Sequence, residues 1–114
     1  MGEPVQAAAE NHYAWGGACD GWHLVRSENL SIIEERMPPG AAEQRHFHTH
    51  ARQFFYVLEG KLTMELDGHL LSLGPRHGLE IAPREPHQAM NRSDAEVRFL
   101  VISQPPSHGD RSPA

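Results

Sequence analysis

The chain has 114 residues, of which 39% are hydrophobic and 22% charged, and its formal net charge is -5. This length gives room for one hydrophobic core, so we expect one globular domain rather than a multidomain or disordered protein. The acidic balance, without any run of Lys or Arg, argues against nucleic acid as a partner.

No disulfide can form within the chain, because Cys19 is its only cysteine. The cytoplasm is therefore the expected compartment. The first eleven residues lack the positively charged start and the apolar stretch of a signal peptide, and about 18 consecutive apolar residues occur nowhere. We expect a soluble protein that does not associate with membranes.

Short strands dominate the predicted secondary structure. Residues 5–11 predict at most a turn or two of helix. Segments of strand type, separated by Gly, Pro and Asp turn residues, then follow at 22–26, 30–37, 53–58, 61–66, 69–73, 79–82, 87–91 and 97–103. "DG" at 67–68 predicts a two-residue hairpin, since both positions tolerate positive φ.

This strand pattern favours an all-β, antiparallel sandwich or jelly-roll barrel, because the strands are close together and no crossover helices separate them. Residues 53–58 and 97–103 are apolar on both faces, which indicates burial on two sides. A second copy of the chain could cover the outer side, so we expect a homodimer.

The chain divides into an N-terminal extension packing on the barrel (1–29), the barrel core (30–103) and a Pro-rich tail (104–114). We expect no regular strand in the tail because of its prolines.

Some polar and aromatic residues have a structural and a functional interpretation. Tyr13, Trp15 and Trp22 are interpreted as apolar plugs for a barrel end, with ligand contact as the alternative. The stretch 34–36, "EER", predicts charge pairs on an exposed face, unless one side chain points into a cavity.

The stretch "HFHTHARQFF", residues 46–55, carries the main functional signal. Side chains alternate faces in a strand, so His46 and His48 point to the same side about 6.6 Å apart along the chain. Two imidazoles at this spacing can share one cation, but they can equally form hydrogen bonds or face water. His50 is roughly 13 Å from His46 in a continuous strand, too far to share the ion easily.

Two further residues can approach this pair. If "THAR" is a turn, the returning strand presents Gln53 and Phe55 on one face, with Gln53 beside the histidines. His87 begins the strand that follows the approach fixed by Pro83 and Pro86.

The same stretch resembles the first motif of the cupins. Gly40, five residues, His46-x-His48, four residues, the position of an acid, six residues and Gly60 reproduce its spacing, but Gln53 replaces the acid. The second motif resembles "RHGLEIAPREPHQAMN", in which His87 and Asn91 keep their interval while Arg76 and Arg84 occupy glycine positions and Ala82 replaces a proline.

The resemblance implies a cupin fold, the double-stranded β-helix or jelly-roll barrel. It also implies a divalent transition metal (Zn, Ni, Mn, Fe or Co) held inside the barrel. Transferred by position, the ligands are His46, His48, Gln53 and His87.

A neutral Gln53 would leave the ion with its full +2 charge, which favours anionic oxygen ligands and removes a carboxylate base from the metal. Around this site we expect Asn91, His50 and Phe55. Asn91 either orients a ligand or caps a strand end, and His50 is interpreted as a turn residue, with a proton shuttle or an extra ligand as alternatives.

The candidate metal site is compatible with two functions. One is a small metalloenzyme acting on an oxygen-rich, anionic molecule as an isomerase, cyclase, decarboxylase or dioxygenase. The other is a non-catalytic barrel that binds or senses a small molecule. The sequence identifies neither the substrate nor a catalytic residue.

Overall fold

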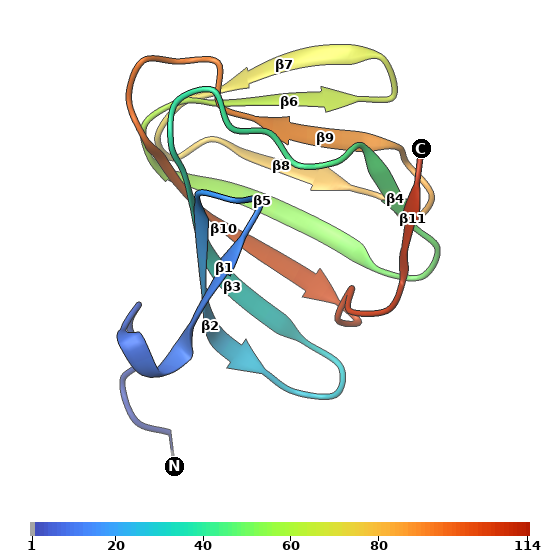
Figure 1. The fold of residues 1–114 in the computed structure, drawn as a ribbon. Coiled ribbons are helices and arrows are strands. Elements are labelled where there is room, and N and C mark those ends of the chain that lie inside the picture. Colours follow the sequence, from blue (N-terminus) through green and yellow to red (C-terminus); the bar gives the residue numbers. More distant parts are fainter. Residues whose placement is uncertain (1) are drawn as a thin grey trace.

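Two antiparallel sheets face each other in the computed structural model, which describes residues 2–114 (Figure 1). The elements are η1, a short 3-10 turn (Ala9–Asn11), and the strands β1 (His12–Trp15), β2 (Cys19–Arg26), β3 (Ser31–Met37), β4 (His46–His48), β5 (Arg52–Glu59), β6 (Leu62–Leu66), β7 (His69–Leu73), β8 (Gly78–Ile81), β9 (His87–Met90), β10 (Val97–Gln104) and β11 (Arg111–Pro113). The expected all-β antiparallel fold is confirmed.

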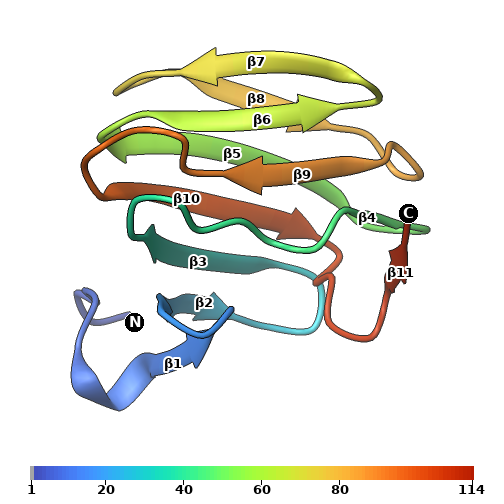
Figure 2. The same ribbon diagram turned by 45° about the horizontal axis from the view of Figure 1, so that its top comes forward.

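The strand order explains the shape of the molecule. A six-stranded sheet runs β1-β2-β3-β10-β5-β8 and a five-stranded sheet runs β11-β4-β9-β6-β7 (Figure 2). Successive strands β4 and β5 lie in different sheets, so the turn between them carries the chain from one layer to the other. Residues of β4 and of the start of β5 therefore approach each other across the interior.

The expected strands are present, with the largest difference at β2, which begins at Cys19 rather than at residue 22. The hairpin at 67–68 is confirmed, since Asp67 and Gly68 have φ of 48° and 90°. Within residues 2–114, no helix is long and apolar enough to cross a membrane.

One expectation about the tail was wrong. Residues 111–113 form a strand, β11, which pairs with β4 so that Arg111 lies opposite His48 and Pro113 opposite His46. A proline is tolerated here because β11 is an edge strand, whose outer side needs no hydrogen-bond donor. The N-terminal extension also contributes strands, as β1 and β2 lengthen the six-stranded sheet beyond β3.

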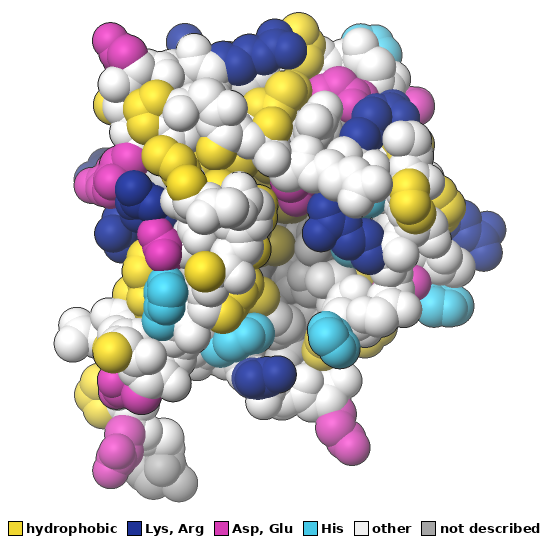
Figure 3. Space-filling view, in the orientation of Figure 1, with side chains coloured by type: hydrophobic (Ala, Val, Ile, Leu, Met, Phe, Trp, Pro, Cys, Tyr) yellow, Lys and Arg dark blue, Asp and Glu magenta, His cyan; other side chains and the backbone are white. Residues whose placement is uncertain are grey.

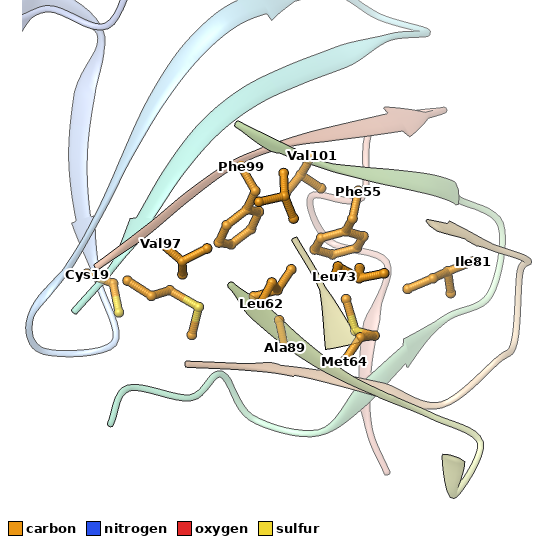
Figure 4. Packing of buried hydrophobic residues seen from close by; sticks show 12 residues of the cluster. Cys19, Phe55, Leu62, Met64, Leu73, Ile81, Ala89, Val97, Phe99 and Val101 are labelled. Atoms are coloured by element: carbon orange, nitrogen blue, oxygen red, sulfur yellow. The ribbon is translucent and has the colours of Figure 1, made fainter. Parts of the chain in front are cut away.

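The apolar core lies between the two sheets (Figure 4). Along the inner face of β10, Val97, Phe99 and Val101 are followed by Ser103, and along β5, Val57 and Phe55 lead back to Gln53. Ser103 is the cross-strand partner of Gln53 on one side and of Ser31 on the other. The interior thus changes from apolar to polar toward one end of the sheet, and the candidate site lies there.

Candidate metal centre

Three histidines meet at the polar end of the interior. His46 and His48 project inward from β4, and His87, the first residue of β9, is the cross-strand partner of His46. Their potential ligand atoms all lie within 4.8 Å of one another, and all three side chains are buried. The same-face pair and the approach of His87 are therefore present.

The backbone orients each imidazole. The Nδ1 atoms of His46, His48 and His87 lie 2.6, 3.2 and 2.9 Å from the carbonyl oxygens of Gln44, Asp110 and Glu85. A carbonyl only accepts a hydrogen bond, so each Nδ1 carries the proton and donates it. The lone pair of each ring is thereby left on Nε2, as a metal ligand requires.

Gln53 lies on β5, across the interior from the histidines, and is 5% exposed. Its Nε2 donates a hydrogen bond of 3.0 Å to Ser103 Oγ. This bond commits the amide nitrogen to Ser103 and leaves the amide oxygen, Oε1, free.

The unpartnered atoms fit a cation. Among the residues that the structure describes, the buried side-chain atoms without a hydrogen-bond partner are His48 Nε2, His87 Nε2, Gln53 Oε1 and, outside the histidine cluster, His23 Nδ1 on β2. Burying such acceptors costs free energy unless something compensates for it. Imidazole nitrogen and amide oxygen are donors that divalent transition metals accept, so these residues could hold such an ion.

Burial also keeps the histidines neutral. It lowers the pKa of His46 to about 3, although the Gln44 carbonyl opposes the shift. Burial likewise lowers the pKa of His48 and of His87. Neutral imidazoles are the form that binds metal, so no proton has to be displaced near neutral pH.

A cavity of about 580 Å³ opens onto this site. His46, His48, Gln53 and Phe55 line it, while His87 is completely buried behind them. The hollow near the centre of Figure 3 has basic and histidine side chains close to its rim. A small organic molecule fits a space of this size.

Two carboxyl groups also line the cavity, Glu35 on β3 and Glu43 before β4. Burial raises the pKa of Glu35 to about 7, against the effects of the Tyr13 hydroxyl and the Arg111 charge. Burial raises the pKa of Glu43 to about 8, and the neighbouring Glu35 adds to that shift. The cavity thus offers proton-exchanging groups although Gln53 is neutral.

The structure gives different roles to the three residues expected around the site. Phe55 is 3% exposed and its ring lies 6.2 Å from that of His87. His50 is exposed in the turn after β4. The Asn91 amide donates to the carbonyls of Met37 and Ala95 and accepts from Ser93, so its contacts are those of the strand-end cap.

Sequence reasoning missed or misplaced several residues of the cavity. Tyr13 and Trp15 line it, whereas Trp22 is not a plug, because its ring lies under the Arg98 guanidinium at 5.0 Å. Ser103 could have been found from the sequence, because it is the polar residue that ends the inward-facing apolar series Val97, Phe99 and Val101. Arg111 could not, because its position depends on the unexpected strand β11.

Comparison with known proteins decides the family. The Cupin domain family model matches residues 33–103, more than half of the chain. The chain is a cupin. The uncharacterized protein MJ1618 of Methanocaldococcus jannaschii is 31% identical to this cupin over 89 residues, which cover 77% of this chain and 71% of that protein.

Two further relatives carry informative names. The polyketide synthase CurC of Streptomyces cyaneus is 35% identical over 69 residues, 60% of this chain, and these span less than half of CurC (45%). The polyketide cyclase RemF of Streptomyces resistomycificus has 25% identity and a TM-score of 0.69 over 75% of this chain and 64% of that chain.

Proposed function

We propose that this cupin binds one divalent transition metal through His46, His48, His87 and Gln53. The ion would polarise an oxygen of a small, oxygen-rich, anionic substrate, which the protein rearranges by proton transfer as an isomerase or cyclase does. One observation carries the proposal: unpartnered nitrogen and oxygen atoms converge at the inner end of a cavity whose walls also carry two protonatable carboxyl groups.

The neutral ligand set supports an anionic substrate. Three histidines and one amide bring no negative charge, so a divalent ion would keep its +2 charge. Arg111 adds a further positive charge to the cavity wall. Carboxylate, enolate and phenolate oxygens are suited to such an environment.

The names of the relatives point in the same direction. RemF is described as a polyketide cyclase and CurC as a polyketide synthase. Polyketides are rich in carbonyl and phenolic oxygens, and their ring closures depend on removing protons next to carbonyl groups. We therefore place 2-oxo acids and 1,3-diketones first among the substrate classes to be tested.

Hydrogen–deuterium exchange tests this function. The protein is loaded with Zn²⁺, Mn²⁺ or Ni²⁺ and incubated in D₂O with pyruvate or 2,4-pentanedione, and loss of the C–H signals is followed by NMR. We expect faster exchange than with the free ion, and none of this acceleration in His48→Ala. If thermal-shift measurements show that the loaded protein binds the probes but no metal accelerates exchange, a binding protein replaces the enzyme.

We also propose that two copies associate through the outer face of the six-stranded sheet and that the protein works in the cytoplasm. Phe54 and Leu58, on the outer face of β5, are 38% and 42% exposed, and the free, buried thiol of Cys19 is suited to a reducing compartment. Analytical ultracentrifugation should give a dimer at micromolar concentration, and a monomer would contradict the first proposal. Cell fractionation tests the second.

A further inference from the structure

The cavity has a second polar wall, which is formed by the N-terminal strands and is separate from the three histidines of the candidate metal centre. Tyr13 on β1, His23 on β2 and Glu35 on β3 line it. The Tyr13 hydroxyl donates a hydrogen bond of 3.2 Å to Glu35 Oε2. None of these residues belongs to the candidate metal centre.

A glycine makes this hydrogen bond possible. Gly21 is the cross-strand partner of Tyr13 on one side and of Glu35 on the other. A Cβ at position 21 would overlap the end of the Tyr13 ring. The ring therefore lies across β2 in the space that a side chain would fill, and its hydroxyl reaches Glu35.

Structural pairing does not account for Glu35. Its neighbours in β3 point outward and form ion pairs, Glu34 with Arg98 and Arg36 with Asp20. Within the described residues 2–114, no ion pair involves Glu35, whose side-chain partner is the neutral Tyr13 hydroxyl. A poorly solvated carboxyl group with one hydrogen bond and no ion pair lowers the stability of the fold. Carboxyl groups in such environments are typical of functional sites.

Glu43, the other carboxyl group of the cavity, is explained by the fold. Its Oε2 accepts a hydrogen bond of 2.8 Å from the backbone N–H of Ala89, and its own N–H donates to the Ala89 carbonyl. These bonds attach the segment before β4 to β9. Glu35 is therefore the carboxyl group that remains free for chemistry.

Glu35 and the histidines share one electrostatic environment. The charge of Arg111, which lies opposite His48 in the β4–β11 pair, lowers the pKa of Glu35 and of His46, His48 and His87. The titratable and charged groups that line the cavity with Glu35 or act on its charge are Tyr13 on β1, Cys19, His23 and Arg26 on β2, Glu43 before β4, His46 and His48 on β4, His108 before β11 and Arg111 on β11. A substrate in the cavity could touch both walls.

We propose that Glu35 is the catalytic residue that exchanges protons with the substrate and that Tyr13 positions it. This inference rests on the proposed function. The Glu35 carboxylate takes a proton from the carbon next to the substrate carbonyl. The C–H electron pair becomes a C=C bond while the carbonyl π pair moves to oxygen, and return of the proton to the same or another carbon gives exchange or isomerisation.

The exchange assay on zinc-loaded protein with pyruvate tests this role. Glu35→Gln should lose about a hundredfold in rate, the usual size of general acid–base catalysis. Its zinc content and its thermal shift with pyruvate should equal those of the wild type. Glu34→Gln, changed at the neighbouring outward position, is the matched control and should keep the wild-type rate.

Tyr13→Phe and Gly21→Ala test the positioning role and keep the proposal falsifiable if Glu35→Gln does not fold. The Tyr13 hydrogen bond lowers the pKa of Glu35, so its loss should move the rising limb of the pH–rate profile to higher pH. In metal-free protein, ¹³C NMR titration of the Glu carboxyl signals should show the same displacement. Tyr56→Phe, on the outer face of β5, should change neither.

The outcomes separate the two proposals. If His48→Ala abolishes exchange but Glu35→Gln keeps the wild-type rate and pH profile, the role of Glu35 is overturned while the proposed function stands. If zinc-loaded wild-type protein does not accelerate exchange of either probe, the proposed function fails, and the role of Glu35 fails with it.

Discussion

At the scale of single residues, Gln53 has the greatest consequence for the chemistry of the site. Its oxygen is free toward the histidines because Ser103 holds its nitrogen. A charged oxygen would attract a cation more strongly than a neutral one. The glutamine at position 53, where the cupin motif has an acid, is therefore expected to determine both metal affinity and substrate preference.

Calorimetric titration with zinc tests whether Gln53 is a metal ligand. We expect Gln53→Glu to bind zinc more tightly than wild type, by about tenfold or more. Gln53→Ala should bind zinc more weakly, by about tenfold or more. Ser103→Ala should weaken binding by about tenfold, because the amide loses its support. Equal affinities in wild type and Gln53→Ala would show that the amide is not a ligand.

Glu43 should make stability depend on pH. Its folded pKa of about 8 lies above its ordinary value of 4.5, so the folded state holds a proton that the unfolded state has lost. The stability from this group is present below about pH 4.5 and is lost as pH rises through 8.

Glu43→Gln removes that dependence. In chemical denaturation of metal-free protein, its free energy of unfolding should rise relative to wild type between pH 5 and 9, by on the order of 2–4 kcal/mol. Glu28→Gln, on an exposed loop, is the matched control. A constant difference between Glu43→Gln and wild type would contradict the assignment.

Arg76 occupies a left-handed backbone conformation, with φ of 69°, at a position where the cupin motif has glycine. That conformation costs about 1–2 kcal/mol for an L-residue, whereas glycine costs about 0.5–1 kcal/mol in chain entropy. Arg76→Gly should therefore be neutral or stabilising by up to about 1 kcal/mol in urea denaturation. Arg92→Gly, also exposed but without positive φ, should be destabilising, and equal losses in both variants would contradict this reasoning.

At the scale of elements, the loop that leads into the C-terminal strand β11 supports the site. The Asp110 carboxylate accepts hydrogen bonds from the backbone N–H groups of Thr49, His50 and Ala51, and its carbonyl accepts from His48 Nδ1. One residue thus fixes both the turn that links the sheets and the orientation of a candidate ligand.

Asp110→Ala should leave three N–H groups without their acceptor. We expect a loss of about 2–3 kcal/mol in the free energy of unfolding. We also expect about tenfold weaker zinc binding, because the backbone carbonyl of residue 110, which accepts from His48 Nδ1, is no longer anchored to the turn by the carboxylate. Asp94→Ala, at an exposed position, controls for the loss of charge. Unchanged zinc affinity in a destabilised Asp110→Ala would limit Asp110 to a structural role.

The strands that could be predicted have strong local signals. β6 and β7 are alternating segments joined by Asp-Gly, and β5 and β10 are rich in β-branched and aromatic residues. β1 and β11 have only four and three residues, and they form because they add to an existing sheet edge. Such pairing depends on tertiary structure, which local sequence does not reveal.

At the scale of the whole molecule, one wall of the cavity could be predicted from local sequence, whereas the other depends on tertiary structure. His46, His48 and Gln53 follow a local spacing that the sequence displays. Glu35 lies in a charged run whose outward members form ordinary ion pairs. Its inward direction follows from strand parity, but its partner Tyr13 comes from a strand that could not be expected.

Binding of a metal should couple this site to the stability of the entire fold. The ligands come from β4, β5 and β9, which belong to both sheets. An ion bound only by the folded state stabilises it by mass action. Removing the ion with a chelator should therefore lower the melting temperature, and restoring it should reverse the change.

The most direct test is the metal content of untagged protein purified without a nickel column. Inductively coupled plasma mass spectrometry should find about one divalent transition metal ion per chain in the wild type and almost none in a His46→Ala, His87→Ala double variant that remains folded by circular dichroism. A folded wild-type protein that neither carries nor takes up a stoichiometric ion would contradict the central claim.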